Sequence, residues 1–186
     1  MSCNLTRALA FLLTSGVIFI TGNACALDVP VKITGTIFIP PCTINNGNKI
    51  EIDFGKISLQ KVDGNNFYQS KTLSVNCAYY QGIPYVKISG VQLPGAGENI
   101  LQTNASGVNA LRLGIALYQG SGVSDSNKLM IGGGSKNYGF PITRGLTDQG
   151  AANSQFTFTA VPYKHGGDDL SAGEFKATAS ISIIYI

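Results

Sequence analysis

Apolar and polar residues alternate along most of this chain, and the pattern predicts extended strands rather than helices. In a strand, every second side chain lies on the same face, and this period of two recurs through the chain. No window of helical length shows an apolar repeat of about 3.6 residues. The alternation is clearest in residues 29–37, 50–54, 73–77, 86–88, 111–117, 140–142, 156–160 and 177–185.

Clusters of Gly, Asn, Asp and Ser separate these segments, as expected of turns between strands. Examples are "PGAGEN" at 94–99, "GSGVSDSN" at 120–127 and "KHGGDD" at 164–169. Many short strands joined by such turns indicate an all-β sandwich or barrel. The sequence shows no internal repeat and no linker long enough to divide it into two domains.

The first 26 residues differ from the rest and predict a secretory signal peptide. Arg7 precedes an apolar stretch over residues 8–20, and Ala24-Cys25-Ala26 fits a small-residue cleavage site. The apolar stretch is shorter than the roughly 20 residues that a membrane-spanning helix needs. We therefore expect a mature chain that starts at Leu27; a lipoprotein signal ending at Cys25 is the alternative.

Cysteine usage is consistent with export. Cys3 and Cys25 lie in the predicted signal, which leaves Cys42 and Cys77 in the mature chain. An even number of cysteines in an exported chain predicts a disulfide between them. Closing so long a loop would stabilise the fold by about 4 kcal/mol in the chain-entropy description.

Charge and composition argue against several classes of function. The 13 Lys and Arg balance 10 Asp and Glu without clustering, so nothing predicts a nucleic-acid or membrane-binding surface. There is one His, and no G-x-S-x-G motif is present. We interpret His165, Asp168 and Asp169 as a solvated turn. We expect no catalytic residues, no metal and no cofactor.

Both ends of the mature chain are predicted strands that lack partners. Residues 27–38 alternate but precede Pro40 and Pro41, which interrupt strand pairing. Residues 176–186 alternate as well, with no proline and no charge after Lys176 to protect an exposed edge. The simplest interpretation is that another chain completes each strand, as in donor-strand complementation.

At this point the sequence resembles the subunits of chaperone–usher pili. The matching motifs are "DVPVKITGTIFIPPCTINNG", a second Cys within a strand, and "LGIALY" at 113–118. At the other end they are the penultimate Tyr185, the alternation before it, and Gly173 as the fourteenth residue from the end. "IPPCTINNG" and "DFGKI" further resemble the adaptor subunit at the tip of the P pilus.

The resemblance implies an immunoglobulin-like sandwich that lacks its seventh strand, over residues 39–186, with a donor-strand extension over residues 27–38. A hydrophobic groove would lie beside the C-terminal strand. In the periplasm a chaperone would lend a strand to this groove and anchor the carboxylate of Ile186. At the outer-membrane usher, the extension of another subunit would replace that strand.

The resemblance also assigns roles to two sets of residues. The donor strand would present Val29, Val31, Ile33, Gly35 and Ile37 to a neighbouring subunit. Pro30 departs from the family pattern and has no N–H, so pairing starts at Val31 or position 30 faces an unpaired edge. The chaperone-binding edge of the groove would consist of Gly173, Phe175, Ala177, Ala179, Ile181, Ile183, Tyr185 and Ile186.

The predicted function is therefore that of a minor subunit of a cell-surface fimbrium, an adaptor between the tip adhesin and the next fibre subunit. The alternatives in the same class are a rod or bulk tip-fibre pilin, or an anchor that ends growth. A small exported carbohydrate-binding module is the alternative from another class, since aromatic side chains stack on sugars. An exported hydrolase is a third. The tyrosines that would form the sugar-binding surface are Tyr79, Tyr80, Tyr85 and Tyr118.

Overall fold

The structure, a computed structural model, describes residues 29–186. It divides into two units, one ending at Thr36 and the other covering Ile37–Ile186. The predicted signal peptide and the first two residues of the predicted extension lie outside the described residues. Within the described range, no helix is long and apolar enough to cross a membrane.

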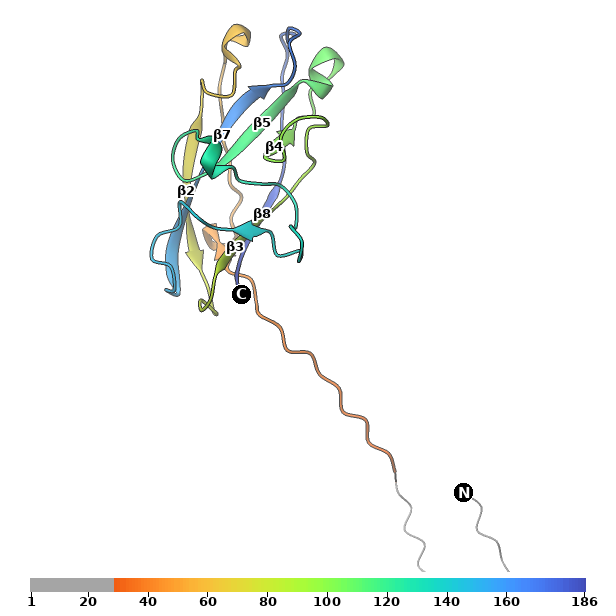
Figure 1. Ribbon diagram of the computed structural model, residues 1–186, viewed down its shortest axis with the longest axis vertical. Coiled ribbons are helices and arrows are strands. Elements are labelled where there is room, and N and C mark those ends of the chain that lie inside the picture. Colours follow the sequence, from red (N-terminus) through yellow and green to blue (C-terminus); the bar gives the residue numbers. More distant parts are fainter. Residues whose placement is uncertain (1–28) are drawn as a thin grey trace, which may run out of the picture. The chain divides into compact units, whose positions relative to one another are not determined.

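The second unit consists of two antiparallel sheets (Figure 1). The order in the five-stranded sheet is β1-β2-β7-β5-β4, and in the three-stranded sheet it is β6-β3-β8. Short 3-10 helices lie in the connections. The strands are β1 (Thr43–Ile44), β2 (Gln69–Asn76), β3 (Pro84–Ser89), β4 (Ile100–Gln102), β5 (Leu113–Gln119), β6 (Phe140–Pro141), β7 (Asn153–Lys164) and β8 (Ser180–Tyr185), and the helices are η1 (Asn45–Gly47), η2 (Leu59–Lys61), η3 (Gly107–Leu111) and η4 (Asp125–Asn127).

The core lies between the two sheets and is built from the alternating residues. Val75, Ile115 and Phe156 of the larger sheet share one buried cluster with Val86 and Ile183 of the smaller sheet. The alternation predicted for residues 73–77 is confirmed, because Leu73, Val75 and Cys77 are buried while the residues between them are exposed. The sequence pattern thus identifies the inward face of most strands.

Strand β5 is buried on both faces, which alternation alone does not predict. Ala116 and Tyr118 point away from the main core, yet they pack against Leu93, Ile100 and Val161 in a second buried cluster. β5 lies between β7 and β4, and the segment around Leu93 covers its outer face. All residues of the run "LGIALYQ" are therefore buried because of its position inside the sheet.

Leu111 was expected to continue strand β5, and this prediction is wrong. Leu111 ends the 3-10 helix η3 and is exposed. The side chain of Asn109 fixes this turn, since its Nδ2 donates to the carbonyl of Ser171 (2.7 Å) and its Oδ1 accepts from the N–H of Ser171 (2.8 Å). A contact distant in sequence has overridden the local pattern.

Three segments with strand-like sequences form shorter strands than predicted, or none. Residues 29–37 and 50–54 contain no strand, and the last strand begins at Ser180 rather than at Lys176. A strand is defined by its hydrogen-bonded neighbour, and these residues have no neighbouring strand within the described part of the chain. The residues 50–54 and 176–179 lie on either side of one opening.

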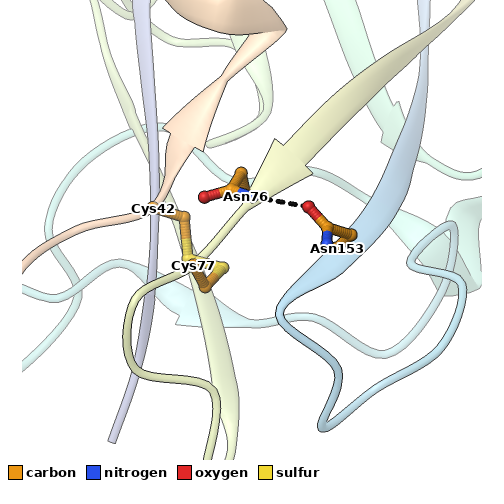
Figure 2. The surroundings of a disulfide bond; sticks show 4 residues. All are labelled: Cys42, Asn76, Cys77 and Asn153. Atoms are coloured by element: carbon orange, nitrogen blue, oxygen red, sulfur yellow. Dashed lines mark hydrogen bonds between the residues drawn. A yellow bond between two sulfur atoms is a disulfide. The ribbon is translucent and has the colours of Figure 1, made fainter.

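The expected disulfide between Cys42 and Cys77 is present (Figure 2). Both residues are buried. The N–H of Cys77 donates to the carbonyl of Ala152 (2.8 Å), and the N–H of Cys42 donates to that of Ile183 (2.7 Å). The disulfide thus joins the start of the domain to the residue that follows β2, close to Ile183 near the end of β8.

Candidate functional site

An open groove of about 980 Å³ runs along one side of the sandwich. Residues 49–57 form one wall, and residues 173–181 form the other. The side chains at the floor of the groove come from both sheets and belong for the most part to the main core. They are those of Ile88, Leu101, Ile115, Leu117, Phe158 and Ala160.

The wall at residues 173–181 leads into an unpaired strand edge. β8 pairs with β3 on one side, and on its other side the carbonyl of Ile183 accepts from Cys42. Backbone groups alternate between the two sides of an antiparallel strand, so those of Ile181 point to the same side as those of Ile183. No strand in the described part of the chain pairs with Ile181 on that side. The free edge thus begins where the contact with Cys42 ends.

The opposite wall lacks backbone partners too. Among the N–H groups of residues 49–57, only that of Gly55 has a hydrogen-bond partner in the described range, the carboxylate of Asp53 (2.8 Å). Ile52 and Phe54 are half-buried and pack against the core from this wall. In the wall at residues 173–181 the backbone of Lys176 is bonded to Asn104, so the unpaired groups there lie toward Ile181. An apolar floor between these groups and the wall at residues 49–57 has the shape of a site for one extended strand.

The two walls meet through an aromatic contact. Phe54 comes from one wall and Phe175 from the other, with ring centroids 6.3 Å apart. Phe175 also packs against a separate buried cluster that contains Leu113 and Leu170. The two walls are thus in contact at Phe54 and Phe175.

The predicted C-terminal site residues divide into two groups. Gly173, Phe175, Ala177, Ala179 and Ile181 line the groove. Ile183 and Tyr185 are fully buried in the core beyond it, where the segment that contains Cys42 covers the strand. Ile186 exchanges backbone hydrogen bonds with Ile83, at 2.8 and 3.0 Å. The groove is therefore formed by the first half of the predicted edge.

The sequence reasoning missed the wall at residues 49–57 and the floor. The alternation of Ile50, Ile52 and Phe54 was recognised as a strand, and this was the signal that could have located the wall. Nothing in a single sequence places it opposite residues 173–181, because the two segments are more than a hundred positions apart in the chain.

The predicted donor residues lie in a segment without secondary structure. Val31 and Ile33 are 80% and 90% exposed. A Cβ added at Gly35 would have no heavy atom within 4 Å. The assignment of these residues as a donor strand stays a prediction, since the structure contains a single chain.

The charged residues of the groove belong to its two walls and not to its floor. Lys49 and Glu51 form an exposed ion pair at 2.7 Å, and this hydrogen bond holds the pKa of Glu51 below its usual value. Exposed pairs of this kind contribute little to stability. The floor of the groove is therefore apolar, while ionic groups lie along its walls.

The other candidate sites from the sequence are not assembled. Asp168 forms an ion pair with Arg112 at 2.6 Å, and the described residues contain no group of three His, Cys, Asp or Glu side chains that could hold a metal. Tyr118 is buried, so the four tyrosines considered for sugar binding do not share one surface.

Comparison with known proteins agrees with this architecture. The family model described as "Fimbrial protein" matches residues 31–186. The chain is 42% identical to the fimbrial adapter PapF of Escherichia coli, over 90% of this chain and 94% of that protein. It is also 42% identical, with the same coverage, to the minor fimbrial protein PrsF of Escherichia coli.

Two solved structures show the same fold. One is the P pilus adaptor subunit PapF, with a TM-score of 0.52, 38% identity, and coverage of 81% of this chain and 100% of that one. The other is the P pilus rod subunit PapA, with a TM-score of 0.52, 23% identity, and coverage of 84% and 100%. The predicted fold class, an incomplete immunoglobulin-like sandwich, is confirmed.

Proposed function

This chain belongs to the fimbrial protein family, and we propose that within a cell-surface pilus it acts as the adaptor between a tip adhesin and the next fibre subunit. The open groove carries the proposal, because a sandwich with this opening is complete only when another strand fills it. The adaptor role is supported by the names of the relatives, a fimbrial adapter and a minor fimbrial protein.

The groove would accept strands from two successive partners. A periplasmic chaperone would donate the first strand and keep the apolar floor from solvent, and at the outer-membrane usher the extension of the next subunit would replace it. Backbone pairing along both walls would give affinity, and apolar side chains over Ile115, Leu117 and Phe158 would give specificity. The exchange needs no turnover chemistry, because it proceeds if the second strand packs better than the first.

The extension would act as the donor toward the adhesin. Val31, Ile33 and Ile37 are exposed in the single chain, so each would gain about 1.5–3 kcal/mol when buried in a neighbour's groove. Ordering the segment would offset part of this gain. The division between the two units, after Thr36, lies close to the proposed end of the extension at residue 38.

Deletion of residues 27–37 separates the two roles. The groove would stay intact, so the shortened chain should still be recovered with its periplasmic chaperone. Joining to the pilin domain of the tip adhesin should be abolished, because the donor strand is missing. Joining that survives the deletion would overturn the donor assignment, and a mature chain that is soluble and stable without any chaperone would overturn the acceptor assignment.

A further inference from the structure

We propose that the loop between β2 and β3 is a docking surface for the body of the subunit whose groove receives this chain's extension. The inference rests on the proposed function. The surface, here called the arm-root surface, consists of Tyr79, Tyr80 and Ile83, which are 39%, 37% and 56% exposed. Tyrosine is enriched in protein interfaces relative to the rest of the surface.

The arm-root surface lies where the extension leaves the domain. Cys42 marks the start of the folded chain, and the disulfide ties it to Cys77, two residues before Tyr79 (Figure 2). Cys42 is also hydrogen-bonded to Ile183 of β8. Ile83 directly precedes β3, whose start lies at the same end of the domain as the end of β8 (Figure 1). The β2–β3 loop and the point where the extension joins the domain thus lie at the same end of the domain.

The chain between the donor residues and the domain is short. Ile37, the last predicted donor residue, precedes Cys42 by five positions. At about 3.5 Å per residue, the distance from Ile37 to Cys42 is at most roughly 18 Å even when the chain is fully extended. Pro40 and Pro41 stiffen the connection. A neighbour that holds Ile37 in its groove is therefore kept within contact range of the arm-root surface.

The chemistry of the surface favours a protein partner over a sugar. Residues 78–83, "AYYQGI", carry no charge. Ile83 is the most exposed of the three side chains and has no aromatic face on which a sugar could stack. Tyr118, which a larger tyrosine surface would need, is buried. The nearest charge is the C-terminal carboxylate of Ile186, whose backbone is hydrogen-bonded to Ile83. A loop that is itself uncharged, next to a donated strand, fits the rim of another immunoglobulin-like subunit.

The first test is a surface variant that combines Tyr79→Ser, Tyr80→Ser and Ile83→Ser in the full mature chain. The matched control replaces three exposed apolar residues elsewhere, by Tyr68→Ser, Val91→Ser and Tyr138→Ser. The partner is the chaperone-bound pilin domain of the tip adhesin from the same pilus. We expect both variants to be captured by the chaperone as the wild type is. Only the first should join the adhesin domain about tenfold more slowly.

A second measurement uses the wild-type chain, so it does not depend on the folding of a variant. Chemical nitration of Tyr79 and Tyr80, located by mass spectrometry, should proceed in the chaperone complex and be suppressed after joining. Tyr68 and Tyr138 should react equally in both states.

Equal joining rates for the two variants together with unchanged nitration would overturn the proposal. Two other results would also overturn the proposal, because each would assign the surface to another partner. One is weaker capture of the first variant alone by the chaperone, and the other is glycan binding by the wild type that the first variant loses. A wild-type chain that does not join the adhesin domain would instead overturn the proposed function on which the inference rests.

Discussion

The substitution Ile33→Ala tests the donor strand where the expected effect is largest and easiest to isolate. Ile33 is 90% exposed in the single chain, so it contributes almost nothing to the stability of its own domain. Buried in a neighbour's groove, it would lose nearly all contact with water. Removing three of its carbons, at about 0.8 kcal/mol each, should cost the joined pair about 2.4 kcal/mol, or roughly 50-fold in equilibrium.

The matched control is Thr34→Ala, the next residue along the extension. Thr34 is exposed too, but alternation places it on the opposite face of the strand. The assay is urea-induced dissociation of the mature chain joined to the adhesin pilin domain, with the chaperone-bound chain as a second sample. We expect Ile33→Ala to lower the dissociation midpoint of the joined pair and to leave the chaperone complex unchanged. Equal midpoints for the two variants would refute the assignment of Ile33 to the buried face.

Three further predictions concern the domain itself. Replacing Cys42 and Cys77 by Ser removes a bond that spans 35 residues, so urea unfolding of the chaperone complex should show a loss of about 4 kcal/mol, and an unchanged midpoint would contradict this. Ile181→Lys places a charge in the groove and should abolish recovery with the chaperone in a pull-down, whereas Ser74→Lys, at an exposed position of β2 outside the groove, should not. Burial raises the pKa of Tyr118, so the unfolded chain loses this proton first as pH rises above about 10. Thermal stability should therefore fall above that pH, and less steeply in Tyr118→Phe.

The fold class could be read from the sequence because alternation is a local property. The face of the sheet on which a side chain lies is set by the position of its residue in the strand. Leu73, Val75, Phe156 and Ile183 are buried as the pattern predicts. Turn clusters then separate the strands, and the motifs near both ends carry the resemblance to pilus subunits. These features need no knowledge of which strand lies next to which.

The groove and its wall at residues 173–181 could be expected from the sequence, but the opposite wall at residues 49–57 could not. Ile52 and Phe54 looked like part of an ordinary strand, yet they face the segment that contains Phe175 across the opening. Ile181 and Ile183 follow the same alternation, yet only Ile181 is open to an incoming strand. The difference arises because Cys42, far away in the chain, covers Ile183 through one hydrogen bond.

The sequence by itself determined the local properties of this protein: strand periodicity, inward faces, a disulfide between the two cysteines of the mature chain, and two apolar segments without partners. Only the tertiary structure decided where these segments meet. Backbone pairing and the contacts between the two groove walls join residues that are far apart in the chain. Such long-range contacts leave no periodic pattern in the sequence. The placement of residues 49–57 opposite residues 173–181 is therefore a property of the folded domain alone.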